Sequence, residues 1–401
     1  MKRKNRRKGL SVPPKAKPEP IDERVIHLTE PNTLSQVFPK DEWNRVVSLK
    51  ITGPMGRKDF DDVLDEICTV DDRIYLDPKD EYGDYVPDYS NAALIRHLDL
   101  GEAIYVDGKE MPYFGDMAPL RSFVLPQGIQ STFEEFEGST GLSCSTNLRS
   151  IAFPKGLKKV GGLSCCPNLT DVVLPDTVEE ISPAAFYGCT AIDHIQIPAS
   201  VRKIGGNSFG KCSVEAFDVD GRNEYFTVVD GVLFSKDLGT LVAFPPAYSR
   251  DRYTVPHGTV RIGDSAFNGV GIREILLPES LRSIGYYAFE GCMVKSLDLP
   301  DSVRELGNYT FVYCTELEHL RLPRTIETLP DKMVVDCYKL KEITIPASVR
   351  RIGEYAFRWC PSIKRFVVHD DPNDPDDTRV LDRKSYFKWE KNQNSIYKHN
   401  N

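Results

Sequence analysis

The sequence lacks the features that mark membrane, nucleic-acid-binding and simple exported proteins. No run of about 18 apolar residues is present, so we expect no membrane-spanning helix. The 51 basic residues do not outnumber the 59 acidic ones, and the net charge of -8 argues against general binding to nucleic acid. The basic start MKRKNRRKGL is followed by SVPPKAKPEP, where an export signal would be apolar. We therefore expect no export signal in this chain.

Signatures of catalysis and of metal binding are missing as well. The patterns G-x-x-x-x-G-K-[ST], G-x-G-x-x-G, G-x-S-x-G and H-E-x-x-H do not occur, and no C-x-x-C pair is present. The seven histidines are scattered along the chain. We predict that the protein is not an enzyme, that it has no catalytic residues, and that it needs neither a cofactor nor a metal.

An internal repeat accounts for most of the chain. Typical units are IREILLPESLRSIGYYAFEGC from Ile272 and LKEITIPASVRRIGEYAFRWC from Leu340, and the shared frame is L-x-x-I-x-L-P-x-S-V-x-x-I-G-x-x-A-F-x-x-C. The frame proline recurs every 21 to 23 residues, apart from one gap between Pro198 and Pro256. These prolines are Pro154, Pro175, Pro198, Pro256, Pro278, Pro300, Pro323 and Pro346. The gap corresponds to one repeat plus an insertion.

Each position of the frame has a physical role. In I-x-L the two apolar residues point to one side of a short strand, and stacked repeats then form a parallel sheet. Proline ends the strand because it cannot donate a ladder hydrogen bond, and the glycine allows a tight corner that a side chain would obstruct. The frame phenylalanines are expected to stack along the core, each stabilising it by about 1.5–3 kcal/mol through burial. They are Phe186, Phe209, Phe267, Phe289, Phe311 and Phe357.

Six cysteines close the repeats at one equivalent position. They are Cys189, Cys212, Cys292, Cys314, Cys337 and Cys360. Two interpretations are open: a ladder that binds metal or undergoes redox chemistry, or a column of buried thiols that pack as small apolar side chains. We favour the buried column, and we assign Cys165 and Cys166 of a shortened repeat to the same column.

The repeats resemble the BspA-type leucine-rich repeats of bacterial surface proteins. The resemblance covers roughly residues 119 to 368 and departs from the frame at Ser182-Pro183 and at Pro330 and Met333. It implies a right-handed, mainly β solenoid of about nine repeats with short turns and helices, used for adhesion or protein binding. It also implies a secreted or cell-surface location. The expected absence of an export signal keeps a cytoplasmic location as the alternative.

Composition and pattern divide the chain into four segments. We expect a disordered basic and Pro-rich leader at 1–30 and an α/β cap at 31–118, with strands at 45–53 and 97–100 around a helix. The array occupies 119–368 and contains a β-hairpin insertion at about 215–253, which either closes a widened repeat or contacts a partner. A polar tail or cap follows at 369–401. Its acidic part, 369–377, is either a solvated loop or a calcium site.

The outward residues of the first strand in each repeat are the candidate binding face. They are Asp171, Val173, His194, Gln196, Glu274, Leu276, Ser296, Asp298, His319, Arg321, Glu342 and Thr344. These residues are not needed for the core, and their mixed polarity suits a protein or peptide partner. The other interpretation is an ordinary solvated sheet face. We expect a non-enzymatic scaffold for binding or adhesion, with an intracellular interaction scaffold as the alternative.

A second row of residues has a positive bias. It lies four residues after each frame proline and comprises Lys158, Glu179, Arg202, Val260, Arg282, Arg304, Glu327 and Arg350, of which five are basic. Like charges on neighbouring strands repel, so this basic row either gains from an anionic glycan or an acidic protein, or is simply solvated.

Overall fold

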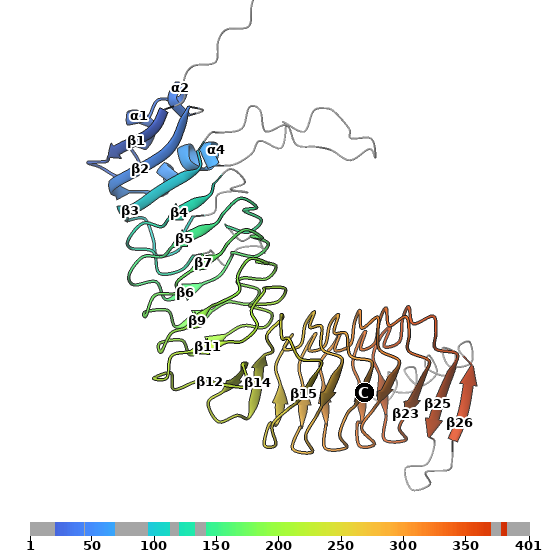
Figure 1. Ribbon diagram of the computed structural model, residues 1–401. Coiled ribbons are helices and arrows are strands. Elements are labelled where there is room, and N and C mark those ends of the chain that lie inside the picture. Colours follow the sequence, from blue (N-terminus) through green and yellow to red (C-terminus); the bar gives the residue numbers. More distant parts are fainter. Residues whose placement is uncertain are drawn as a thin grey trace, which may run out of the picture.

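The protein is a β solenoid bent into two arms. The computed structural model describes residues 21–43, 45–68, 95–112, 120–132, 142–369 and 378–382. The chain winds through about 13 turns with little helix. Figure 1 shows an N-terminal arm, from β1 to β11, that meets a C-terminal arm, from β15 to β26, at a corner formed by β12 and β14.

The N-terminal cap and the first repeats share one sheet. Its strands pair in parallel in the order β1 (Ile21–His27), β2 (Val46–Met55), β3 (His97–Tyr105), β4 (Ser122–Val124), β5 (Ser150–Ala152) and β7 (Asp171–Val172). The expected strand, helix and strand of the cap are therefore present, but they are built as the first turns of the solenoid. This is one reason why the turns outnumber the repeats that are recognisable in the sequence.

Strand β1 corrects the expected extent of the leader. It lies within residues 1–30, which we expected to be disordered, yet it pairs with β2 from Ile21↔Val46 to His27↔Thr52. Ile26 and Leu28 are also buried. Pairing with a strand about 25 residues away supplies the hydrogen bonds, and local composition gives no sign of such a partner. Residues 1–20 of that leader lie outside the described residues.

Short helical turns cover the cap. They are α1 (Leu34–Val37), α2 (Lys40–Trp43), α3 (Arg57–Asp59), the π-helical turn η1 (Phe60–Leu64) and α4 (Asp65–Cys68). The buried carboxylate of Asp59 accepts hydrogen bonds from the backbone amides of Asn32 (2.8 Å), Leu34 (2.8 Å) and Gly56 (2.9 Å). Asp59 therefore holds two turns of the cap together, because its oxygens satisfy amides that would otherwise lack partners.

Later coils contribute short strands to separate sheets. In the N-terminal arm one sheet consists of β6 (Lys159–Val160), β8 (Glu180–Ile181) and β10 (Lys203–Ile204). A second sheet consists of β9 (Gln196–Ile197) paired with β11 (Asp218–Val219). In the C-terminal arm the first strands of four coils form a parallel sheet. They are β15 (Arg252–Thr254), β17 (Glu274–Leu276), β19 (Ser296–Asp298) and β21 (His319–Arg321). The second strands are β16 (Arg261–Ile262), β18 (Ser283–Ile284), β20 (Glu305–Leu306), β22 (Thr328–Leu329) and β24 (Arg351–Ile352).

An antiparallel strand closes the C-terminal end of the described array. Strand β23 (Glu342–Ile345) pairs in parallel with β25 (Arg365–His369), and β26 (Thr378–Asp382) then pairs antiparallel with β25. The last parallel strand therefore does not end in an open edge. Residues 370–377, with most of the proposed calcium loop, lie outside the described residues. Within the described residues no group of three or more His, Cys, Asp or Glu side chains is placed to hold a metal.

The insertion forms the joint between the arms. Strands β12 (Phe226–Val229), β13 (Val232–Ser235) and β14 (Thr240–Ala243) are antiparallel neighbours, as expected for a hairpin set, and β14 continues in parallel to β16. Successive residues of a strand point to opposite faces. Accordingly, Leu233 belongs to the hydrophobic core of the N-terminal arm, whereas Val232 and Phe234 belong to that of the C-terminal arm. The insertion thus connects two cores.

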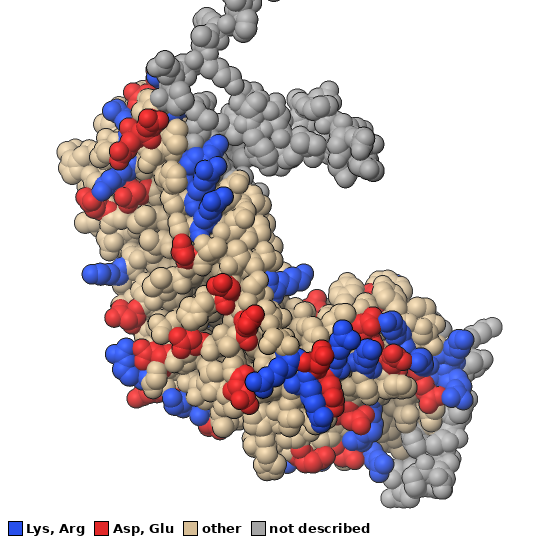
Figure 2. All heavy atoms as spheres, in the orientation of Figure 1, with Lys and Arg blue, Asp and Glu red and all other residues tan. Residues whose placement is uncertain are grey.

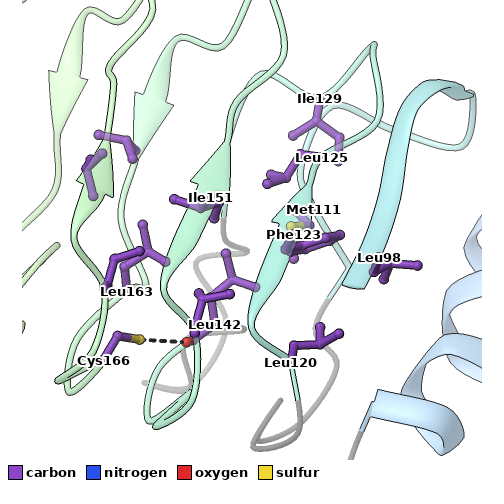
Figure 3. Packing of buried hydrophobic residues seen from close by; sticks show 14 of the residues in the cluster. Leu98, Met111, Leu120, Phe123, Leu125, Ile129, Leu142, Ile151, Leu163 and Cys166 are labelled. Atoms are coloured by element: carbon purple, nitrogen blue, oxygen red, sulfur yellow. Dashed lines mark hydrogen bonds between the residues drawn. The ribbon is translucent and has the colours of Figure 1, made fainter. Parts of the chain in front are cut away.

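Phenylalanine stacking holds neighbouring coils together. Phe289 is fully buried, and its ring stacks on Phe267 (5.1 Å between centroids) and on Phe311 (5.4 Å). Phe186 and Phe209 stack in the N-terminal arm at 6.1 Å. The column is interrupted between Phe311 and Phe357, where Val334 occupies the phenylalanine position. Figure 3 shows how apolar side chains from successive N-terminal coils, including Leu142 and Leu163, meet between the sheets.

The cysteine column has a second role besides packing. The six frame cysteines are buried thiols, and five of them donate a hydrogen bond from Sγ to a carbonyl of the preceding coil. The shortest runs from Cys314 to the carbonyl of Phe289, at 2.9 Å. Cys166 does the same with Leu142 at 3.3 Å (Figure 3). Cys165, which we had placed in this column, is exposed instead, because it stands one position before the column, where the next coil has Gly188, and Cys166 fills the column position.

Candidate interaction surfaces

The first-strand face is the outward row of residues predicted above. Most of its members are exposed, and only two, Glu342 and Thr344, are half-buried. The exposed members are Asp171, Val173, His194 and Gln196 in the N-terminal arm and Glu274, Leu276, Ser296, Asp298, His319 and Arg321 in the C-terminal arm. Between the outward residues the inward ones, such as Ile275, Leu297 and Leu320, are buried. The face is divided, because β7, β9 and β17 belong to three different sheets.

The C-terminal part of this face is an ordered pattern of charge. Ser296 lies opposite His319, and Asp298 lies opposite Arg321. Ion pairs join neighbouring coils: Arg252 with Glu274 (3.4 Å) and Arg365 with Glu342 (2.6 Å). Figure 2 shows red and blue side chains interleaved across the front of this arm. Exposed pairs of this kind add little stability, so their main effect is to set the surface potential.

Carboxylates beside this face are kept ionised by their partners. A hydrogen bond from Lys341 lowers the pKa of Glu318, whose carboxylate lies 2.6 Å from the ammonium. The backbone amide of Arg324 lowers the pKa of Asp301, which also pairs with Arg321 at 3.1 Å. The pattern of charge therefore persists at neutral pH.

The basic row is less available than its sequence indicated. In the N-terminal arm the Glu179 carboxylate lies between Lys158 (2.8 Å) and Arg202, and the hydrogen bond from Lys158 lowers the pKa of Glu179. In the C-terminal arm Arg282 donates to the carbonyl of Glu279 (2.9 Å), and Arg304 donates to that of Asp301 (2.6 Å). These guanidinium groups are thus already used within the protein, which weakens the interpretation of the row as an anion-binding surface.

The N-terminal part of the basic row also lines a shallow groove. Its walls are formed by Lys158, Lys159, Glu179, Glu180, Arg202 and Lys203. Glu180 pairs with Lys203 at 3.1 Å and with Lys159 at 3.6 Å, so acids alternate with bases here as well. An anionic ligand would have to displace these pairs.

A third surface was not recognised in the sequence. We call it the aromatic rim: Tyr286, Tyr287, Tyr309, Tyr313, Tyr338, Tyr355 and Trp359. Its residues follow the second strand of four successive C-terminal coils, and Tyr286, Tyr313, Tyr338, Tyr355 and Trp359 are each 50% to 54% exposed. The available signal was the recurrence of aromatic residues nine and thirteen positions after the frame proline.

The rings of the rim are held in place by one another and by cations. Tyr287 and Tyr309 stack at 4.6 Å, and Lys332 donates to the hydroxyl of Tyr309 at 2.8 Å. The guanidinium of Arg358 lies 4.5 Å from the ring centroid of Tyr355 and 4.2 Å from that of Trp359. Such cation–π contacts contribute about 0.5–1 kcal/mol at exposed sites.

Comparison with known proteins agrees with this architecture. The family model described as "BspA type Leucine rich repeat region" matches six copies over residues 113–228 and 243–364. A leucine-rich repeat protein from Eubacterium ventriosum has a similar structure, with 18% identity, a TM-score of 0.51, and coverage of 78% of this chain and 89% of that one. Among curated protein sequences none matches the chain.

Two further solved structures share a lower similarity. The pneumococcal vaccine antigen PcpA has 20% identity and a TM-score of 0.43, over 81% of this chain and 63% of that protein, so the chain spans less than two thirds of its length. A leucine-rich cell surface protein from Faecalibacterium prausnitzii has 19% identity and a TM-score of 0.45, over 86% of this chain and 81% of that one. Among the described residues no helix is long and apolar enough to span a membrane. The matched segments cover more than half of the sequence, and the chain therefore belongs to the BspA-type leucine-rich repeat family.

Proposed function

We propose that the protein is a non-enzymatic binding scaffold whose first-strand face recognises a protein or peptide, in the manner of an adhesion module at a bacterial surface. The observation that carries the proposal is the separation of scaffold from surface along β17, β19 and β21. Each strand buries its central residue and exposes the residues on either side. The exposed residues can vary without loss of the core, so they are free to serve recognition.

The charge pattern supports a specific partner. Acidic and basic groups alternate between neighbouring coils, as at Asp298 and Arg321, and do not form a field of one sign. A partner that matches this order gains attraction, whereas a mismatched one meets like charges. The surface is also wide enough for several contacts, because the sheet extends over four coils from β15 to β21.

The test reverses the order of charges on two register partners. In the double variant Asp298→Lys, Arg321→Glu the two residues remain opposite charges, whereas the exposed ion pair of Arg321 with Asp301 is lost. Because exposed pairs add little stability, the free energy of unfolding should stay within about 1 kcal/mol of the unchanged protein. Proteins captured by the immobilised full chain should be lost from this variant, as measured by quantitative mass spectrometry.

The matched control exchanges a pair on another surface. Lys158→Glu, Glu179→Lys also swaps paired charges on adjacent coils, but within the basic row. We expect this control to capture the same proteins as the unchanged chain. If the control loses them while the first-strand variant retains them, the binding face has been assigned wrongly.

A further inference from the structure

The aromatic rim is not explained by the needs of the fold. Several of its residues have left-handed backbones: φ is 54° at Tyr287, 61° at Tyr309, 57° at Tyr313, 58° at Tyr355 and 56° at Trp359. A bulky side chain in this conformation is a genuine outlier, because its Cβ approaches the following carbonyl oxygen.

Other coils fill the same positions with residues that carry no aromatic ring. The position of Tyr313 and Trp359, thirteen residues after the frame proline, is held by Gly188, Gly269 and Gly291 elsewhere, all with positive φ. The position of Tyr287, nine residues after the proline, is held by Asn207 and Ser265. Ala184, Lys211 and Lys332 also occupy these positions with positive φ, so the left-handed backbone is a property of the coil. What is particular to these C-terminal coils is that aromatic rings fill positions where the fold accepts glycine, alanine or lysine, and this choice indicates a role outside folding.

The electrostatics of the rim limit the class of ligand. Its two cations, Lys332 and Arg358, lie over rim rings. Four carboxylates are interspersed with the rings: those of Glu290, Asp331, Asp336 and Glu354. Acidic and basic groups are mixed here, so the rim has no positive field to attract a polyanion, whereas groups that donate hydrogen bonds find acceptors.

We propose that the aromatic rim binds an uncharged polysaccharide. The C–H bonds on one face of a pyranose ring carry slight positive charge and stack on the electron-rich face of an aromatic ring. The sugar hydroxyls then donate to carboxylates such as Asp336 and Glu354. The rim presents rings in coil after coil along the arm, and a polymer of sugar rings offers contacts that repeat along its length in the same way.

Preorganisation of the rim supports binding. Two sets of contacts fix ring orientations before a ligand arrives. Arg358 contacts the rings of Tyr355 and Trp359, and Tyr287 stacks on Tyr309. Rings that are already immobilised lose less conformational entropy on binding. Half of each exposed ring is still accessible to solvent, so contact area remains for the sugar.

The experiment is native affinity electrophoresis of the full chain in gels that contain laminarin, xylan, mannan or dextran, with heparin as the polyanion. We expect at least one uncharged polymer to retard the protein and heparin not to. Trp359→Gly, matched to Gly291, should keep or raise the melting temperature but weaken the apparent affinity about tenfold or more. Trp359→Tyr should restore binding, because it replaces the ring.

Two controls separate this proposal from others. Tyr225→Ala removes a 48% exposed tyrosine of the insertion, outside the rim, and should be retarded like the unchanged chain. The first-strand variant Asp298→Lys, Arg321→Glu should also be retarded normally, so the two surfaces are tested independently. Retardation by heparin alone, retardation by none of the uncharged polymers, or full retardation of Trp359→Gly would each overturn the proposal. Loss of captured proteins from Trp359→Gly without any glycan effect would assign the rim to a protein partner instead.

Discussion

Phe289 shows how far a single side chain depends on the coils beside it. Its ring lies between those of Phe267 and Phe311, and none of its surface is exposed. Phe289→Ala should therefore lower the free energy of unfolding by about 3–5 kcal/mol, because it removes apolar contacts and leaves a cavity. Urea unfolding followed by circular dichroism measures this. Tyr286→Ala, at an exposed position of the same coil, is the control and should cost under about 0.5 kcal/mol.

The cysteines divide into two classes that differ in reactivity. Cys144 and Cys165 are exposed, whereas the remaining eight are buried. Burial raises the pKa of Cys292 to about 12, so the reactive thiolate is scarce near neutral pH. A thiol reagent at pH 8 should label two sites quickly and the others only on unfolding, as read by peptide mass spectrometry. Fast labelling of Cys292 in the native protein would refute this packing.

At the scale of the structural element, the corner after a second strand depends on glycine for space wherever the frame glycine is present. A Cβ placed on Gly307 would lie 2.4 Å from the backbone nitrogen of Tyr286 in the preceding coil. We predict that Gly307→Ala destabilises the protein by about 2 kcal/mol or more, because two backbones must separate. Gly221 has no heavy atom within 4 Å of such a Cβ and provides the control. Equal melting temperatures for the two variants would contradict this account.

The frame glycine was predicted correctly to allow a tight corner, but only the structure shows which atoms a side chain would meet there. The frame predicts that a side chain would obstruct the turn, and the contacts at Gly307 support this. The obstruction arises between coils, and the positive φ values of the coil occur elsewhere, at residues such as Tyr287 and Tyr309. Glycine in this frame is therefore a stacking residue.

At the scale of the whole molecule, the two arms have separate cores that meet at β13. Stability in a solenoid is roughly a sum over coils and their interfaces. Phe289→Ala should therefore reduce protection from hydrogen exchange across the C-terminal arm, residues 252–368, and leave residues 142–204 close to normal. Phe186→Ala should produce the reverse pattern. Loss of protection spread evenly over both arms in both variants would show that the molecule unfolds as one unit.

The sequence by itself determined the coil. Residues close along the chain decide where a strand begins, where proline ends it and which side chains point inward, and the same frame is repeated many times. This is why the parallel strands, the buried phenylalanines and the six buried frame cysteines could all be predicted. The inward and outward sides of the first strand followed from the same alternation, as Leu320 and Arg321 show.

Features that depend on contacts between residues far apart in the chain were decided only by the tertiary structure. Four findings depend on such contacts: β1 pairs with β2, Cys165 is exposed, Arg304 donates a hydrogen bond to a backbone carbonyl, and the core is divided at β13. The aromatic rim belongs here too, because stacking of successive coils brings its residues into one surface. The physical reason is that a solenoid places residues about 22 positions apart side by side, so contacts between coils determine which polar groups remain free for a partner.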